Sequence, residues 1–422
     1  MLGRVKSLIY IPLLVLSIVV QAQEKKFTLV SGQHGLLPIP IKISFAELDF
    51  SANNDSLTIN IYRQAKGAQV LLKSQVQHGD QRVLWFVPDT PISANTKVNF
   101  IIRAEAPNAV DQRKPDVVMD ANNIHLVAGE QDVLDYRHAF KEAPEAANPI
   151  YGKSGYIHPL YTPKGNVLTR IQPKDHYHHY GIWNPWTKTK VNGREVDFWN
   201  LALGEGTVRY AGLISKYSGS VFSGFKLRQE HVTFQNIGPD QVAINETWEV
   251  RNYPVNIDGK QCWLIDMIVT LNNNLDTLIE LTNYRYGGGI GFRATEYWTN
   301  QNSSVLTSEG RTRIDADGTY ARWCKVEGAF PSGSNSGIVF FSHPDNRAHP
   351  EPMRVWPIDA NGGRGDVYFE FCPTRHKKWD LMPNKEYVLK YRMLVFDDEF
   401  TAENAESVWQ SFANEANIEW EK

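Results

Sequence analysis

Short apolar or alternating segments, each bounded by turn residues, run through almost the whole chain and constrain its fold most strongly. Segments of this length and composition predict β-strands, because successive strand residues face opposite sides of a sheet. Clusters such as Asn53-Asn54-Asp55 are typical of the turns between them. The only strong helical pattern covers Thr401 to Asn414, where Thr401 suits an N-cap and Glu403 lies near the positive end of the helix dipole. The sequence therefore predicts an all-β protein.

The chain of 422 residues is longer than one typical hydrophobic core requires, so two domains are expected. Residues 23–108 predict a small N-terminal β-sandwich, and the Pro- and Asp-containing stretch from Ala106 to Pro115 is the expected linker. Residues 109–422 predict a large antiparallel two-sheet β-sandwich, because their strand patterns are long, rich in aromatics and without an internal repeat.

The N-terminus has the pattern of a secretory signal peptide. Arg4 and Lys6 precede an apolar run from Leu8 to Val20, and a cleavage pattern ends at Ala22. We therefore expect residues 1–22 to be removed near Ala22 and the protein to be periplasmic or secreted. No later segment approaches the roughly 18 apolar residues of a membrane-spanning helix. A net charge of −3 gives no reason to expect a nucleic-acid partner, so we expect neither membrane insertion nor nucleic-acid binding.

The segment from Asp175 to Trp186 contains three imidazoles, two phenols and two indoles. Imidazole acts as base, acid or metal ligand near neutral pH, and the aromatic rings suit the flat faces of sugars. In a strand, His176 and His178 would share a face, whereas His178 and His179 would point to opposite faces; in a loop this argument fails. The alternative is a hydrogen-bonded structural cluster. We interpret the segment as one wall of a functional site, and we assign to it His178, His179, Tyr180 and Trp183.

Four further motifs are candidates for the same site. His158 precedes a proline and a turn, and a structural role is an equally good interpretation of it. Trp199 follows an Asn-Gly hairpin signal, and such a residue belongs to the core more often than to a sugar-binding surface. Arg293 ends a glycine-rich segment that lets the backbone approach a ligand closely, and its guanidinium can bind a carboxylate or sulfate in a bidentate manner. The segment from His343 to Arg347 is either a Pro-rich loop presenting polar groups or a surface turn.

Metal and redox chemistry receive little support from the sequence. Cys262, Cys324 and Cys372 lack the spacing of a structural zinc site and can form at most one disulfide. The stretch from Asp315 to Gly318 lacks the remaining ligands of a calcium loop and reads as a turn. No cofactor is firmly implied, although a divalent metal bound by the histidines is compatible with the pattern, so the metal ligands stay unassigned.

Together these motifs resemble a family of secreted bacterial glycan-utilisation proteins that carries the label "methane oxygenase PmoA". The resemblance covers most of residues 120–400, and the N-terminal domain lies outside it. Two departures are Tyr180, where the family often has Arg after His-His, and the insertion Arg194-Glu195-Val196. The label conflicts with the chain, because a membrane oxygenase subunit needs several spanning helices. A looser similarity is to the oligosaccharide dehydratases of ulvan breakdown. The matching segments are His158 to Gly165, His178 to Trp183, Asn192 to Trp199, Gly288 to Arg293 and His343 to Arg347.

The expected function is that of a carbohydrate-active lyase or dehydratase. It would eliminate water or a glycosyl group from the non-reducing-end uronic acid of anionic oligosaccharides such as ulvan fragments, leaving a 4,5-unsaturated uronate. An arginine would neutralise the carboxylate, His178 or His179 would remove the C5 proton, and Tyr180 or His343 would protonate the leaving oxygen. The alternatives are a non-catalytic sugar-binding protein and a metal-dependent glycan hydrolase. The expected catalytic residues are His178, His179, Tyr180, Arg293 and His343, and the expected substrate-binding residues are His158, Trp183, Trp199, Asn346 and Arg347.

Overall fold

The computed structural model describes residues 23–48, 58–79, 82–105 and 114–421. The predicted signal peptide and most of the predicted linker lie outside these residues. Strands account for 52% of the structure and helices for 6%, which confirms the all-β prediction. The α-helix α1 (Ala402–Ala413) begins where the sequence predicts, and the Thr401 hydroxyl caps it by accepting from the Asn404 backbone N–H. No helix in the described residues combines the length and apolar character needed to cross a membrane.

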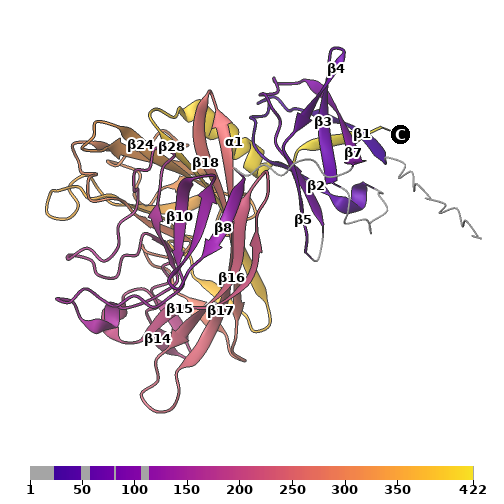
Figure 1. Cartoon of the computed structure of the whole chain (residues 1–422). Coiled ribbons are helices and arrows are strands. Elements are labelled where there is room, and N and C mark those ends of the chain that lie inside the picture. The colour runs from indigo at the N-terminus through magenta and orange to yellow at the C-terminus, as the bar shows by residue number, and fades with distance from the viewer. Residues whose placement is uncertain (1–22, 49–57, 80–81, 106–113, 422) are drawn as a thin grey trace, which may run out of the picture.

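The N-terminal part is a small sandwich of two sheets, drawn in indigo and purple in Figure 1. Its core includes Phe27 and Phe100, whose stacked rings have centroids 5.1 Å apart. The C-terminal strand β29 (Asn417–Trp420) returns to this domain and pairs with β1, so both ends of the described chain meet in one sheet. The five-stranded sheet has the order β29, β1 (Glu24–Val30), β7 (Lys97–Glu105), β3 (Thr58–Ala65) and β4 (Ala68–Leu72), and the three-stranded sheet has the order β2 (Ile41–Ser44), β6 (Val83–Phe86) and β5 (Ser74–Gln77), with the 3-10 helix η1 (Phe45–Glu47) after β2.

The large domain consists of long antiparallel sheets packed face to face. Its nine-stranded sheet has the order β22 (Tyr320–Ala321), β25 (Glu351–Val355), β26 (Tyr368–Phe371), β20 (Ile290–Arg293), β12 (Ile182–Trp183), β11 (Tyr156–Leu160), β10 (Gln131–Arg137), β9 (Asn123–Ala128) and β8 (Pro115–Met119). Its eight-stranded sheet has the order β15 (Gly206–Tyr217), β16 (Ser223–Thr233), β17 (Gln241–Ile257), β18 (Lys260–Asn273), β28 (Glu386–Asp397), β24 (Asn335–Ser342), β23 (Trp323–Ala329) and β21 (Ser303–Thr307). A four-stranded sheet has the order β14 (Arg194–Val196), β13 (Thr189–Val191), β19 (Ile279–Leu281) and β27 (Trp379–Leu381), and two further 3-10 helices are η2 (Pro149–Tyr151) and η3 (Leu201–Leu203).

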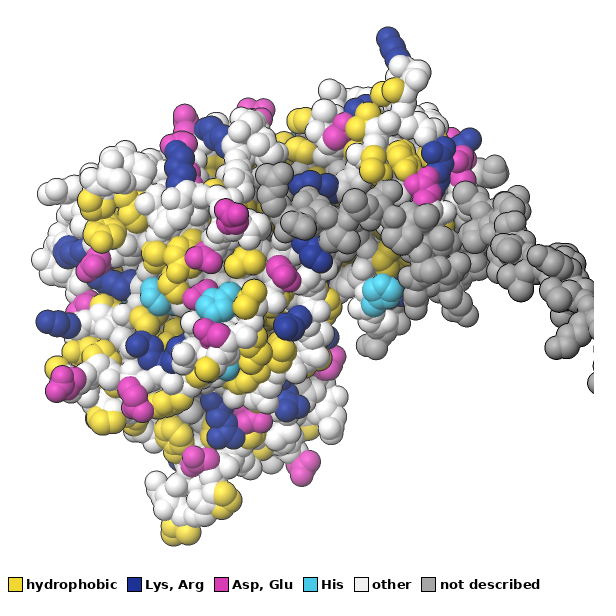
Figure 2. Space-filling model, viewed as in Figure 1, with side chains coloured by type: hydrophobic (Ala, Val, Ile, Leu, Met, Phe, Trp, Pro, Cys, Tyr) yellow, Lys and Arg dark blue, Asp and Glu magenta, His cyan; other side chains and the backbone are white. Residues whose placement is uncertain are grey.

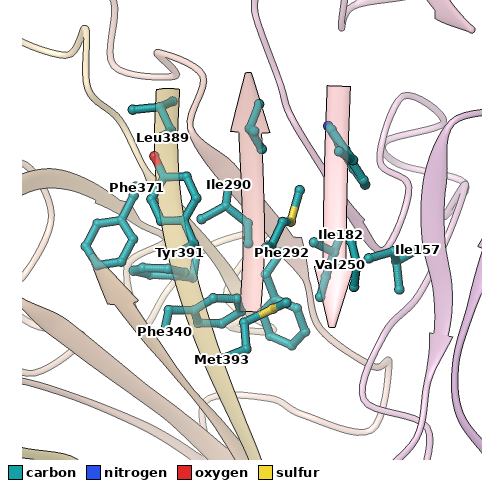
Figure 3. Close-up of a cluster of buried hydrophobic side chains, with 14 of the residues drawn as sticks. Ile157, Ile182, Val250, Ile290, Phe292, Phe340, Phe371, Leu389, Tyr391 and Met393 are labelled. Atoms are coloured by element: carbon teal, nitrogen blue, oxygen red, sulfur yellow. The ribbon is translucent and has the colours of Figure 1, made fainter. Parts of the chain in front are cut away.

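Figure 3 shows the core between the two large sheets. Ile182 and Phe292 from the nine-stranded sheet meet Val250 and Met393 from the eight-stranded sheet, and all four side chains are fully buried. Burying apolar surface in this way is the main stabilising contribution in a domain of this size.

Alternation along the strands places polar residues on the other face of the nine-stranded sheet. In β20, Phe292 points into the core, so its neighbour Arg293 points away from it. In β26, Phe369 and Phe371 belong to the core, so Tyr368 and Glu370 point away from it. Both outward-facing residues and Arg293 are nevertheless buried, because loops cover this face of the sheet. The covered polar face is where the candidate site lies.

The two domains pack together through a mixed interface. Trp85 contacts Phe222 and Tyr253, with ring centroids 5.6 and 5.7 Å apart. The Gln75 side-chain oxygen accepts hydrogen bonds from the backbone N–H groups of Val221 and Phe222. The packed aromatic rings and the hydrogen bonds to the main chain together stabilise one arrangement of this contact.

The molecular surface and the thiols agree with the composition. Figure 2 shows Lys and Arg interspersed with Asp and Glu on the visible face of the large domain. The three cysteines are free and buried, and none of them pairs with another.

Candidate functional site

A cluster of aromatic side chains covers the polar face of the nine-stranded sheet. Trp183 and Tyr368 rise from the sheet itself, while Trp199 and Trp356 come from loops. Trp199 stacks on Tyr368 with an interplanar angle of 10° and donates its indole N–H to the His178 carbonyl at 2.6 Å. This cluster is the frame that holds the histidine segment in place.

Asn184 anchors the histidine segment to the sheet below. It follows Trp183 and donates its amide to the Glu246 carboxylate at 2.5 Å, deep between the two sheets. The same carboxylate accepts from the His231 imidazole at 2.6 Å and from the Trp248 indole at 2.6 Å. All of these groups are buried, so each of these hydrogen bonds offsets part of the cost of burying a polar group. The position of Trp183 is therefore fixed from beneath.

The three histidines of the segment form a triangle of touching rings. The ring centroids lie 4.8 Å apart for His176 and His179, 4.8 Å for His178 and His179, and 5.5 Å for His176 and His178. Burial, reinforced by His176 and Arg293, lowers the pKa of His178 to about 4. Burial also lowers the pKa of His179 far below its usual range, and the His179 Nδ1 has no hydrogen-bond partner among the described residues. His178 and His179 are therefore neutral at physiological pH.

His176 differs from its two neighbours because it is paired with a carboxylate. Its Nδ1 lies 2.7 Å from Asp175 Oδ2, and its Nε2 has no hydrogen-bond partner among the residues that the structure describes. Burial alone would raise the pKa of Asp175, but the His176 hydrogen bond and the charge of Arg293 outweigh it and hold the pKa below its usual value. An imidazole oriented by a carboxylate in this way is an arrangement suited to proton transfer.

Arg293 lies beneath this pair and is completely buried. One of its terminal nitrogens binds Asp366, and the guanidinium carbon lies 4.7 Å from the centre of the Trp356 ring. Its Nε and Nη1 have no hydrogen-bond partner among the described residues. Burial, together with the charge of Arg170, lowers the pKa of Arg293 to about 10. A buried cation with unpaired donors is costly, and such costs are typical of functional sites.

Asp366 is the shared counter-ion of several arginines. It accepts from Arg170 at 2.8 Å and also binds Arg293 and Arg364. Burial would raise the pKa of Asp366, but these three positive charges keep it below its usual value. Arg293 also lies 3.7 Å from Asp175, so three arginines face two carboxylates and the region attracts a further anion.

A pocket of about 210 Å³ opens beside His176. The loop between β25 and β26 contributes four of its lining residues, and the end of β25 contributes a cationic side chain. Its lining residues are His176, Tyr286, Arg354, Trp356, Pro357, Ala360 and Asn361.

Arg354 and Tyr286 give the pocket its polar groups. Arg354 is held by Asp317 at 2.8 Å and donates to the Tyr286 hydroxyl at 3.2 Å. The Trp356 indole N–H donates to the same hydroxyl at 3.1 Å. Because the Tyr286 oxygen accepts two hydrogen bonds, its own proton is directed elsewhere. Glu370 lies behind this layer, where burial raises its pKa far above the usual range and the Tyr368 hydroxyl donates to it at 2.6 Å.

Five of the predicted site residues come together in this region. They are connected by the ring contacts described above and by the contact of the Arg293 guanidinium with Trp356. Most of them are buried, whereas the residues of a surface site would be exposed. They are His178, His179, Trp183, Trp199 and Arg293.

His158 and Tyr180 lie next to the cluster but have other roles. His158 binds the Thr169 hydroxyl at 2.9 Å through Nδ1, and burial lowers its pKa to about 4. Tyr180 packs against Tyr156, and its hydroxyl donates to the Tyr151 carbonyl at 2.5 Å. Its proton is therefore engaged by a backbone carbonyl, and Tyr180 is not among the residues that line the pocket described above.

The segment from His343 to Arg347 makes its contacts elsewhere in the domain. His343 packs on Phe412 of α1, with ring centroids 5.0 Å apart. Asn346 donates to the Lys390 carbonyl at 2.8 Å and accepts from the Lys390 N–H at 2.7 Å, which ties the loop to β28. Arg347 binds the Lys378 carbonyl and covers the Trp379 ring. None of these contacts involves the histidine segment or a residue that lines the pocket, so the structure does not bring His343, Asn346 and Arg347 together with the other predicted site residues.

The site also contains residues that the sequence motifs did not single out. Asp175 and His176 lie inside the histidine segment, and Tyr286 lies just before the glycine run, so proximity to a motif was a usable signal. Arg354 and Asn361 lie in a strand and a loop with no such signal, because nothing local distinguishes them from other surface-type residues.

The described residues contain no group of three or more His, Cys, Asp or Glu side chains arranged to hold a metal ion. The three histidine rings touch one another instead of converging on a common point. The described residues therefore offer no set of metal ligands for the alternative of a metal-dependent glycan hydrolase.

Comparison with known proteins gives a family but no activity. No curated protein matches the chain. A family model described as a family of unknown function (DUF6807) matches residues 123–410, which include every residue of the site and all strands of the two large sheets except β8. The chain therefore belongs to this family of unknown function, DUF6807.

Proposed function

We propose that the pocket binds the terminal uronic acid of an anionic oligosaccharide and catalyses β-elimination across C4 and C5. The observation that supports this most is that His176, oriented by Asp175, and Arg354, held by Asp317, line the same pocket. A base and a fixed cation facing one cavity are what elimination next to a carboxylate requires.

The size and lining of the pocket suit a single sugar ring. A volume of about 210 Å³ is smaller than the roughly 300–1,000 Å³ of sites for drug-sized ligands. Trp356 and Tyr286 offer flat apolar faces with polar edges, which complement a pyranose. The proposal is therefore that a chain end enters, with the rest of the oligosaccharide outside the pocket.

The reaction begins with charge neutralisation of the carboxylate. Arg354 lines the pocket, and its Nε has no hydrogen-bond partner among the described residues, so in this proposal its guanidinium binds the carboxylate of the uronate. The positive charge of Arg293 beneath Trp356 adds to this field. Neutralising the carboxylate stabilises the negative charge that develops when the C5 proton leaves.

His176 then acts as the base, in place of the His178 and His179 expected from the sequence. An effective base has a pKa near the working pH, and the pKa of His178 is about 4. The free Nε2 of His176 accepts the C5 proton, and the electrons of the C5–H bond form the C4–C5 double bond while the C4–O bond breaks.

Tyr286 donates the proton that the departing oxygen needs. Its oxygen already accepts from Arg354 and Trp356, so its O–H is available to the pocket. The leaving group departs as water or as a glycan hydroxyl, and solvent carries the proton from the His176 imidazolium back to Tyr286. The products are a 4,5-unsaturated uronate and the protonated leaving group.

The test is turnover of saturated uronate-ended oligosaccharides, including ulvan-derived ones, followed by the ultraviolet absorbance of the conjugated double bond. His176→Gln is expected to lower kcat by about 10²–10⁴-fold while substrate binding persists. His34→Gln changes an exposed histidine of the N-terminal domain and is expected to match the wild type. A His176→Gln variant with the wild-type rate would remove the proposed base, and binding without product would favour a sugar-binding protein.

A further inference from the structure

Asn361 makes a bridge between two carboxylates of the site. Its side-chain amide donates to Asp175 Oδ2 at 2.7 Å and to Asp366 Oδ2 at 3.0 Å. Asp366 is fixed by its arginines, whereas the Asp175 side chain is 34% exposed and hydrogen-bonds the catalytic imidazole. The amide therefore joins a rigid group to a partly exposed one, and its hydrogen bond is shorter than the 3.7 Å contact between Asp175 and Arg293.

The loop that contains Asn361 is held firmly at both ends. Arg313 donates to the carbonyls of Pro357 at 3.0 Å and Gly365 at 2.8 Å. Within the loop, the Gly365 N–H donates to the Ala360 carbonyl at 2.8 Å. Four hydrogen bonds from one buried guanidinium, two of them to the flanking carbonyls of Trp356 and Asp366, give this loop a defined shape. Asn361 is thus presented to Asp175 from a preformed wall.

The backbone of Asn361 favours this residue type. Its φ is 56°, in the left-handed region that asparagine adopts more readily than most residues. A short amide side chain in this conformation reaches the two carboxylates, and it supplies two donors without adding charge. The residue meets a conformational and a hydrogen-bonding requirement at one position.

We propose that Asn361 is a positioning residue, which fixes Asp175 and through it directs the imidazole of His176 toward the pocket. The proposal rests on the proposed function for the role of His176 as base, but its geometric part stands apart from turnover. It extends the site to a chain of hydrogen bonds that runs from Asp366 through Asn361 and Asp175 to His176.

The test compares variants of Asn361 with variants of Asn384, an exposed asparagine with the same φ of 56°. Asn361→Gly removes the amide while tolerating the left-handed backbone, and Asn361→Asp keeps the size but replaces donors by acceptors. The first readout is carbethoxylation of His176 by diethyl pyrocarbonate in the free protein, located by peptide mass spectrometry. The second readout is kcat and KM for the uronate-ended oligosaccharides.

Without the amide of Asn361, Asp175 holds the His176 imidazole less firmly, so the ring is expected to react about tenfold faster. This factor corresponds to the free energy of about one hydrogen bond to a charged group. Loss of the amide is also expected to lower kcat more than it changes KM, because the base is misdirected but the pocket persists. Asn384→Gly is expected to match the wild type in both readouts. A purely structural role for Asn361 would change thermal stability without changing His176 reactivity.

The proposal would be overturned if Asn361→Gly folds and its His176 is carbethoxylated at the wild-type rate. Should Asn361→Gly fail to fold, Asn361→Asp decides the question by the same readout. Wild-type protein without turnover but with an Asn361-dependent modification rate would refute the proposed function and leave the positioning role in place. Turnover that is unaffected in both Asn361 variants would refute the positioning role and leave the proposed function in place.

Discussion

Replacing Arg293 by Met separates the effect of its buried charge on folding stability from its contribution to turnover. Burial lowers the pKa of Arg293 from its usual value to about 10. At neutral pH Arg293 is charged in both states, and its lowered pKa means that the charge is less favourable in the folded state. Because each pKa unit corresponds to 1.36 kcal/mol, the buried charge lowers the free energy of unfolding by about 3 kcal/mol. Methionine keeps the apolar contact with Trp356, and Asp366 retains Arg170, Arg364 and Asn361.

Arg293→Met is therefore expected to unfold at the same guanidinium concentration as the wild type or at a higher one, with a gain of up to about 3 kcal/mol. It is also expected to lower turnover at least about tenfold, because the field on the substrate carboxylate is lost. Unfolding would be followed by tryptophan fluorescence and turnover by ultraviolet absorbance.

Arg392 provides the matched control. It is also buried, but it binds Asp266 through two hydrogen bonds of 2.6 and 2.9 Å. Burial would lower the pKa of Arg392, but the charge and hydrogen bonds of Asp266 raise it above the usual value. Arg392→Met should cost about 3–5 kcal/mol, because Asp266 loses its partner. Equal destabilisation by the two variants, or normal turnover by Arg293→Met, would refute this reasoning.

Two further predictions concern Tyr180 and Glu351. Tyr180→Phe should leave turnover unchanged and cost only about 1 kcal/mol of stability, measured by denaturant unfolding, because its hydroxyl binds the Tyr151 carbonyl; a large loss of kcat would restore Tyr180 as the acid. Burial raises the pKa of Glu351 from 4.5 to about 7 despite three hydrogen bonds. Because the folded state holds this proton and the unfolded state does not, stability should fall between about pH 4.5 and pH 7. The fall should be about 3 kcal/mol larger in the wild type than in Glu351→Gln, and equal slopes in the two proteins would contradict the assignment.

The fold was predictable where local pattern decides it. Alternating and apolar runs predicted the strands, and the cap at Thr401 predicted the start of α1. The return of Asn417–Trp420 to the N-terminal sheet was not predictable, because its partner is strand Glu24–Val30 at the other end of the chain. Four residues contain too little pattern to specify a partner so remote in sequence.

The candidate site was predictable in its location but not in its assignment of roles. The density of imidazoles and indoles between Asp175 and Trp186 marked the region, and the glycine-rich run marked Arg293. Which histidines are buried depends on the covering Trp199, which packs on His178 and His179, and burial is what makes these two weak bases. The segment from His343 to Arg347 resembled a site, but Asn346 uses its amide to pair with the backbone of Lys390.

The most direct test of the central claim is one paired absorbance measurement. Wild-type protein and His176→Gln would be incubated with the same saturated uronate-ended oligosaccharide, and their products weighed by mass spectrometry. The account predicts that absorbance rises with the wild type and that the product mass shows loss of water or of a glycan. It predicts almost no rise with His176→Gln. An equal rise with both proteins, or none with a wild-type protein that binds the oligosaccharide, would contradict it.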